Sequence, residues 1–325
     1  GVVTITARNK GEAGNDALIV LNKFSGEVTP AGLTIALSQM SGGAGNPDFA
    51  DALAAMGDDP FQIISAPYSD ASNLTKIADE MARRWGPLVM SGGVYISALN
   101  KNFSDAKAVG AAQNSAFISL PNCYGTPTPS DEIGANTAGL VSAAAEIDPA
   151  RPFQTLKLSG VMAPDKNVRF TTQENDGLLK NGVATLSFND AGEIRIQRMI
   201  STYQTNAAGS PDVSYLDINT PLTLEYIRQD FKNYMAGKYP RYKLAGNKAN
   251  FGAGQPVMTP NLGAAEAMKK FRDWERAALV EDADQFKKDL IVEINPNNPT
   301  RLDFLLSPNL VNQFRVGGVK VQFLL

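Results

Sequence analysis

The sequence has no histidine, and its 325 residues include one cysteine, Cys123. Without histidine the usual general base of Ser-His-Asp and Cys-His sites is missing, and so is the commonest transition-metal ligand. A single cysteine cannot form an internal disulfide, and without histidine it cannot build an ordinary structural zinc site. A structural protein needs no group that titrates near neutrality, so we expect a chain that is not an enzyme and holds neither a cofactor nor a metal.

An excess of charge of one sign and long apolar runs are also lacking. The 30 Lys and Arg residues stand against 33 Asp and Glu residues, so the formal net charge is -3 and there is no overall basic field to hold a polyanion. No apolar run approaches the roughly 20 residues that cross a bilayer. We therefore expect no nucleic-acid partner and no membrane insertion.

The residues that are present predict a globular chain with a sizeable core. Hydrophobic residues make up 43% of the sequence, which suits one large domain or two of ordinary size. Residues 2–7 have the pattern of a strand already under way, and a second strand is predicted at 17–21 after turn-rich residues. We expect residues 1–22 to be the end of a small β unit begun upstream, in an N-terminal region that this sequence lacks.

From Leu33 onward, short apolar runs alternate with helical stretches. The predicted strands are residues 33–37, 62–66, 94–98 and 116–120. The predicted helices are residues 47–55, 72–85, 104–114 and 130–147. Four repeats of this alternation predict an α/β domain with a mainly parallel sheet flanked by helices, placed at residues 23–219.

The second half of the chain has a different pattern. A β-hairpin is predicted within residues 178–203, with strands at 184–188 and 193–199 around a turn. An apolar stripe after Pro221 predicts a helix, and we begin an α+β C-terminal domain at residue 220. That domain is expected to contain a loop at 245–255, a helix at 264–278, strands at 290–294 and 301–306, and a short helix or turn near 308–312.

The last ten residues form a candidate arm strand. They are Val316, Gly317, Gly318, Val319, Lys320, Val321, Gln322, Phe323, Leu324 and Leu325. From Val319 they alternate between apolar and polar positions, and the two glycines before them allow a hinge. On pattern alone the strand can pair within the chain's own sheet or join the sheet edge of a neighbour, where it would be a subunit interface.

A competing interpretation is an α/β enzyme or small-ligand binder that uses loops at strand ends, around Ser41, Ser97 and Cys123, with Asp70 as a metal-binding candidate. The glycine-rich residues 41–46 lack the Walker lysine, which favours a turn in which Asn46 caps the next helix. For Asp70 a turn or cap role is favoured, because no second ligand converges on it. A nucleophilic Cys123 would need an activating base, and none is visible.

Two charged clusters have similar pairs of interpretations. Arg83 and Arg84 beside Trp85 suit a nucleic-acid surface or the dipole at a helix end, and we favour the second. The acidic residues between Glu281 and Asp289 suit a basic patch on a neighbour or a solvated helix face, and again we favour the second.

Several segments together resemble the tail sheath family of contractile phages, most closely the Mu-like type. The resemblance covers nearly the whole chain. It is carried by residues 7–15, Ala66-Pro67-Tyr68-Ser69-Asp70, Arg83-Arg84-Trp85-Gly86-Pro87, Arg151-Pro152-Phe153-Gln154-Thr155-Leu156, residues 176–182, 198–203 and 279–282, Asn298-Pro299-Thr300-Arg301-Leu302-Asp303 and the closing strand. No segment is specific alone, but their order and spacing together are.

The resemblance implies an α/β domain of the kind called subtilisin-like, a label for topology only, followed by a C-terminal sheath domain. In that family subunits form six-membered rings stacked helically around a tail tube, and terminal arms add strands to sheets of neighbouring subunits. It also implies residues 316–325 as the C-terminal arm and partners that are further copies of this chain, the tube protein, and baseplate and tail terminator proteins. The implied location is the virion tail, assembled in the cytoplasm of the bacterial host, where contraction drives the tube through the target cell envelope.

Overall fold

The computed structural model describes residues 1–8 and 10–322. They divide into two compact units, one of residues 1–148 with 153–222 and one of residues 149–152 with 223–325. Each unit has its own hydrophobic core.

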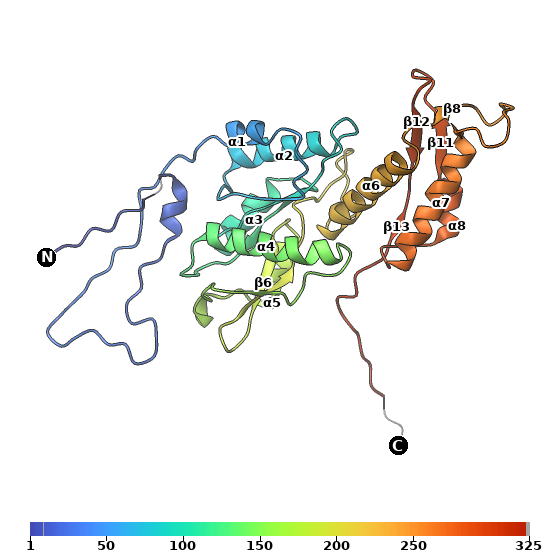
Figure 1. The fold of residues 1–325 in the computed structure, drawn as a ribbon. Helices are drawn as coiled ribbons and strands as arrows, with labels where there is room; N and C mark the ends of the chain where they lie inside the picture. The colour runs from blue at the N-terminus through green and yellow to red at the C-terminus, as the bar shows by residue number, and fades with distance from the viewer. Residues whose placement is uncertain (9, 323–325) are drawn as a thin grey trace. The chain divides into compact units, whose positions relative to one another are not determined.

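The first unit is built on short, mostly parallel strands (Figure 1). The parallel strands are β1 (Ile63–Ser65), β2 (Val94–Ile96), β3 (Ile118–Ser119), β4 (Pro121–Asn122) and β6 (Ala184–Phe188). Only Leu120 separates β3 from β4, so the group β1-β2-β3 runs on into the group β4-β6-β7-β5. The antiparallel members are β7 (Ile194–Arg198), which forms a hairpin with β6, and β5 (Lys157–Leu158).

Helices cover both faces of this sheet, and all but the first of them lie between its parallel strands in the sequence. They are α1 (Ala50–Met56), α2 (Ala71–Trp85), α3 (Phe103–Ala111), α4 (Ser130–Ile147) and α5 (Thr172–Leu179), with 3-10 turns at Glu12–Asp16 and Lys166–Val168. Alternate residues of β2 face opposite cores: Val94 packs in the cluster that contains Val141 of α4, whereas Tyr95 packs in the cluster that contains Leu74 of α2. Burial of both faces is typical of parallel sheets and confirms the predicted α/β class.

The second unit is α+β. Its helices are α6 (Asn219–Lys238), which begins in the first unit, α7 (Pro260–Arg276) and α8 (Ala283–Asp289). The described residues of this unit also form three two-stranded sheets: β8 (Lys243–Leu244) with β9 (Val257–Met258), β10 (Val280–Glu281) with β13 (Asn309–Leu310), and β11 (Ile291–Ile294) with β12 (Leu302–Leu305).

Aromatic residues fill the core of this second unit. Phe231 of α6 lies 5.0 Å from Phe304 of β12 between ring centroids, and Phe271 of α7 stacks on Phe286 of α8 at 4.3 Å. Gly263 of α7 lets the helix approach the hairpin closely, because a Cβ there would lie 3.1 Å from the side chains of three hairpin residues. The helix is thereby seated directly on one face of β11 and β12.

Three strands predicted from the sequence do not form in this chain. Residues 2–7, 17–21 and 33–37 are extended but unpaired, and Glu12–Asp16 is the only regular element before α1 within the described residues. An extended segment becomes a strand only when a neighbouring backbone takes up its N–H and C=O groups, and among the described residues these segments make no such backbone-to-backbone ladder. Near residues 308–312 the predicted helix or turn is instead the short strand β13, which pairs with β10.

No helix among the described residues is both long enough and apolar enough to span a membrane.

Candidate assembly site

The chain after β13 is extended and forms no helix or strand through residue 322 (Figure 1). Val316 is 84% exposed, and Val319 and Val321 are each 86% exposed, with Gly317 and Gly318 between them. The predicted strand at 316–325 is therefore not paired within the chain over its described part, and Phe323, Leu324 and Leu325 lie outside the described residues. An extended segment with alternating apolar side chains and no strand partner in its own chain can add a strand to another sheet. The role of residues 316–325 as a subunit interface stays a prediction.

The β11–β12 hairpin could receive a strand, because its outer edges are not paired with any other strand within the described residues. Within the described residues β11 and β12 pair only with each other. On the face away from α7, Ile291 and Leu305 lie directly opposite each other across the strands and are 50% and 55% exposed. A two-stranded sheet with an exposed apolar pair and open edges is a ready template for a further strand.

A buried carboxylate joins α6 to α7. The side chain of Glu266 in α7 is 11% exposed, and it accepts hydrogen bonds from Lys238 at 2.8 Å and from the hydroxyls of Tyr234 and Tyr239. Burial alone would raise the pKa of Glu266, but these hydrogen bonds outweigh it and hold the pKa at about 2. The carboxylate is thus charged at neutral pH and fixes the helix that carries the hairpin. Sequence analysis missed this network, since scattered Tyr and Lys residues carry no signal of their own.

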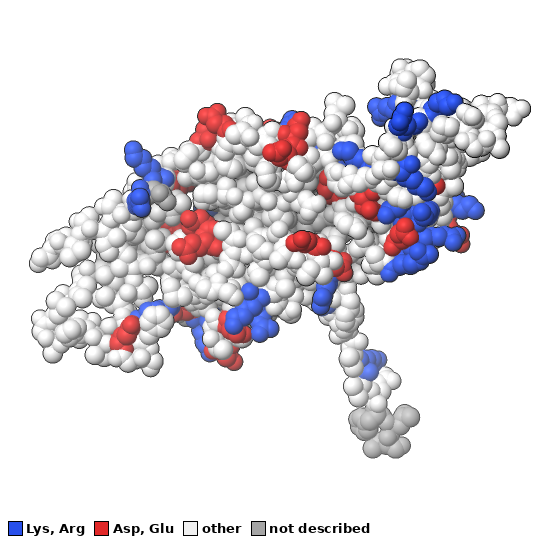
Figure 2. All heavy atoms as spheres, in the orientation of Figure 1, with Lys and Arg blue, Asp and Glu red and all other residues white. Residues whose placement is uncertain are grey.

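Lys and Arg gather on the second unit around β8 and along α7, with fewer acidic side chains among them (Figure 2). The sequence has five Lys or Arg residues and no Asp or Glu between Asp230 and Glu266. A local basic surface therefore exists although the whole chain has a formal charge of -3. That acid-free run is the signal by which sequence analysis could have found the surface.

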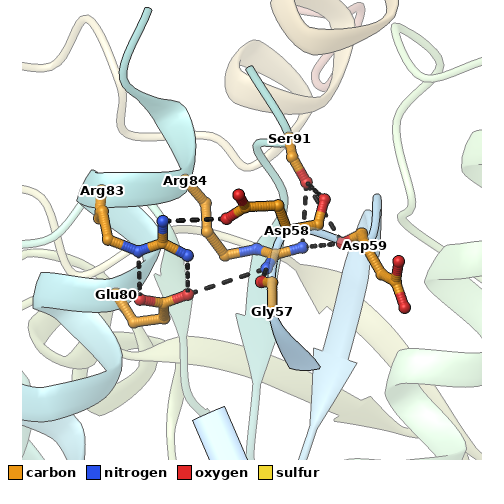
Figure 3. Close-up of polar contacts among 7 residues, drawn as sticks. All are labelled: Gly57, Asp58, Asp59, Glu80, Arg83, Arg84 and Ser91. Carbon is orange, nitrogen blue, oxygen red and sulfur yellow. Dashed lines mark hydrogen bonds and ion pairs between the residues drawn. The ribbon is translucent and has the colours of Figure 1, made fainter. Parts of the chain in front are cut away.

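Arg84, near the end of α2, is fully buried and reaches the loop that follows α1 (Figure 3). Its guanidinium donates to the carbonyl of Gly57 at 2.7 Å, to the carbonyl of Asp59, and to the hydroxyl of Ser91 at 3.0 Å. A buried guanidinium that already binds carbonyl groups is closed to a nucleic-acid phosphate. It also lies 3.8 Å from the carboxylate of Glu80 in its own helix, but its hydrogen bonds to carbonyl groups go to the loop after α1, so it anchors that loop to α2.

The neighbouring Arg83 lies at the surface and has a different role. It donates to Glu80 at 2.7 Å and to Asp58 at 3.0 Å (Figure 3). These carboxylates raise the pKa of the Arg83 guanidinium, and the hydrogen bonds that Arg83 donates to Glu80 are the larger cause. Both arginines are therefore engaged with α2 and its adjoining loop.

The strand-end loops do not assemble into a ligand site. Asp70 is the N-cap of α2, where it accepts a hydrogen bond from the backbone N–H of Asn73, as the cap interpretation predicted. Asn46 does not cap α1, whose N-cap is Phe49; its amide instead bridges Glu12 and Asp70. The predicted cap position was therefore three residues early. In the glycine-rich residues 41–46, Gly42 and Gly45 have positive φ, a conformation that favours glycine.

Cys123 is fully buried, and burial raises the pKa of its thiol to about 12. A thiol with that pKa is almost wholly protonated near neutrality and is a poor nucleophile. Ser97 is also buried. Across residues 1–8 and 10–322, no cluster of three or more Cys, Asp or Glu side chains is arranged to hold a metal ion.

In the acidic segment, Asp282 caps α8 by accepting a hydrogen bond from the backbone N–H of Gln285, while Glu281, Asp284 and Asp289 are exposed. This arrangement agrees with a solvated helix face.

Comparison with known proteins covers nearly the whole chain. The phage tail sheath protein central domain matches residues 42–202, and the phage tail sheath C-terminal domain matches residues 210–323. A Mu-like prophage FluMu tail sheath protein of Haemophilus influenzae is 35% identical over 323 residues, which are 99% of this chain and 66% of the relative. The chain thus spans just under two thirds of that relative's length.

Solved structures share the fold at low sequence identity. A sheath tail protein from Listeria innocua is 16% identical with a TM-score of 0.58, over 85% of this chain and 60% of that one. The helical sheath of the anti-feeding prophage in its contracted state is 14% identical with a TM-score of 0.51, over 85% of this chain and 73% of that one. The central and C-terminal sheath domains match in order along this chain, and the Haemophilus influenzae relative aligns with 99% of it. The chain belongs to the phage tail sheath family.

Proposed function

We propose that this chain is the structural subunit of a contractile tail sheath, or the greater part of it. The subunit would polymerise as stacked six-membered rings around a tail tube, and the sheath would contract to drive the tube through a target cell envelope. Family membership over both domains carries this proposal. A structurally similar chain was solved as a helical sheath in a contracted state, which supports the same role here.

The proposal assigns the C-terminal arm, residues 316–325, to the joint between subunits. Over its described residues, 316–322, the arm is unpaired in its own chain, and so are the edges of the β11–β12 hairpin. The two would complement each other between two copies. Backbone hydrogen bonds would supply attraction, while Val319 and Val321 would set the register against the exposed pair Ile291 and Leu305. Gly317 and Gly318 would be the hinge that lets subunits turn during contraction while the strand stays paired.

The other proposed partners are the tail tube protein and the baseplate and terminator proteins at the two ends of the tail. The proposed location is the virion tail, after assembly in the cytoplasm of the bacterial host. The role requires no catalytic step from this chain. The basic surface around β8 and α7 would suit an acidic protein surface among these partners.

Electron microscopy of three proteins tests the proposal: the full-length natural protein, this 325-residue chain, and a full-length version that ends at Arg315. Tubular polymers from the full-length protein, absent or much reduced in the version without the arm, are the expected result. Dispersed particles in all three samples across varied salt and pH would overturn the sheath role. Equal polymerisation with and without the arm would overturn the joint alone.

A further inference from the structure

Residues 2–7, 17–21 and 33–39 are extended but are not paired as strands. Side-chain amides hold residues 12–19 and 39–46 side by side: Asn15 exchanges two hydrogen bonds with the backbone of Gly43 at 2.8 and 2.9 Å, and Gln39 exchanges two with the backbone of Ile19, each at 3.0 Å. The partner of residue 15 is residue 43 and the partner of residue 19 is residue 39, so the two segments run antiparallel. Within the described part of residues 1–46, the only backbone-to-backbone bonds outside the 3-10 turn close local turns.

A groove of about 1250 Å³ lies between residues 1–7 and residues 33–44. Its walls alternate in the manner of strands. Val3 and Ile5 on one wall are 88% and 59% exposed, and Leu33, Ile35 and Leu37 on the other are 53%, 42% and 40% exposed. Lys10 is the only charged side chain among the lining residues. Side chains of this kind on both walls, with unpaired backbone beside them, fit an uncharged or weakly charged β-strand.

We propose that this groove receives a β-strand from the same polypeptide, from a part of the full-length protein outside residues 1–325. The strand would pair with residues 2–7 on one side and 33–39 on the other and would complete a small sheet. Residues 33–39 span about 23 Å at roughly 3.3 Å per residue, so five to seven residues, as an estimate, would fill the groove.

A strand of the same polypeptide is favoured over a second copy for two reasons. The matched relative and the Listeria sheath chain are longer than this chain, which spans 66% and 60% of their lengths, so members of this family have further chain to supply the strand. Consecutive strands usually lie beside each other, and a strand joined to Val2 by a two- to five-residue turn, the usual range, would pair with residues 2–7 without a long connection. The inference does not depend on contraction or polymerisation.

Hydrogen exchange measured by mass spectrometry tests the inference on three samples: the full-length protein kept monomeric, as verified by sedimentation, the full-length protein after polymerisation, and this 325-residue chain. We expect residues 2–7 and 33–39 to be protected in the full-length monomer and to exchange rapidly in the 325-residue chain. Protection that appears only in the polymer would assign the groove to a neighbouring copy. Protection already present in the 325-residue chain, or in none of the samples, would also overturn the inference.

A matched pair of substitutions locates the strand within the groove. Ile35→Asn, on the groove wall, should raise exchange of residues 2–7 at least tenfold in the full-length monomer. Val28→Asn should not, because Val28 is 80% exposed, follows the turn at residues 24–27 and does not line the groove. Neither change should alter exchange of residues 2–7 in the 325-residue chain. Equal effects of the two changes in the full-length monomer would place the protecting strand elsewhere.

Discussion

Replacing Val319 and Val321 by asparagine in the full-length protein should severely weaken polymerisation. In an extended arm these two side chains share one face, while Lys320 and Gln322 share the other. If the valine face is buried in a neighbour's sheet, V319N/V321N removes that burial. The matched control, K320N/Q322N, changes the same number of residues on the same segment but leaves the valine face intact.

The magnitude follows from the exposure of the arm. Both valines are 86% exposed in the single chain, so nearly all of their apolar surface is available for burial. Full burial of a valine contributes roughly 1.5–3 kcal/mol, so the pair contributes about 3–6 kcal/mol to each joint. Ordering the backbone of residues 316–322 opposes this by roughly 7–14 kcal/mol at about 1–2 kcal/mol per residue. Backbone hydrogen bonds to the neighbouring sheet therefore have to supply the rest of the binding free energy.

Loss of about 3–6 kcal/mol from such a joint corresponds to roughly a 10²- to 10⁴-fold weaker contact, since about 1.4 kcal/mol is a factor of ten. Sedimentation of the full-length protein over a concentration series gives the critical concentration for polymerisation. We expect V319N/V321N to raise it by at least two orders of magnitude and K320N/Q322N to change it by less than about tenfold. Equal critical concentrations for the two variants would refute the reasoning, because burial of one face would then play no part.

Three further predictions concern the stability of this chain. Arg84→Met removes the hydrogen bonds of a buried guanidinium to the carbonyl groups of Gly57 and Asp59 and to the hydroxyl of Ser91. It should lower the free energy of unfolding by about 3–5 kcal/mol in a denaturant titration, against less than about 1 kcal/mol for Arg83→Met at the surface. Similar losses for the two variants would contradict the anchoring role of Arg84. The pKa of Glu266 in the folded chain is about 2, below its ordinary value of 4.5, so its contribution to stability is present above about pH 4.5 and is lost as pH falls toward 2. Glu266→Gln should therefore flatten the pH dependence of unfolding in that window, and an unchanged profile would contradict a stabilising role for the charged Glu266 carboxylate. Gly263→Ala should destabilise the folded chain by about 1–3 kcal/mol through overpacking against the β11–β12 hairpin. Gly237→Ala, where a Cβ meets no atom within 4 Å, should leave the stability unchanged or raise it by up to about 1 kcal/mol. The reverse order of the two variants in thermal unfolding would contradict the close approach of α7.

Much of the first unit could be predicted because its signals are local. The apolar runs around Val94 and Ile118 lie between helical stretches with recognisable ends, and α4 begins and ends at the predicted residues 130 and 147. Helix α5 was missed although Thr171 and Glu174 form a capping box at its start, because its eight residues are mostly polar and carry little apolar periodicity.

The remaining features depend on partners that a sequence pattern does not specify. Residues 33–37 alternate as a strand should, but whether a neighbouring backbone lies beside them is a property of the assembled fold. The role of Arg84 was likewise hidden, since an arginine near a helix end suits a surface charge as well as a buried loop anchor. The arm was found from its alternation, and its unpaired state could not be read from that pattern.

The buried Cys123 makes the chain convenient for site-specific labelling. It is the only cysteine, and burial raises its pKa to about 12, so maleimide reagents at pH 7 should leave it unmodified while the chain is folded. A cysteine introduced at an exposed position of the arm would then be the one reactive thiol. A fluorescent dye attached there would allow the arm to be followed in real time, without replacing the natural thiol and disturbing the core around it.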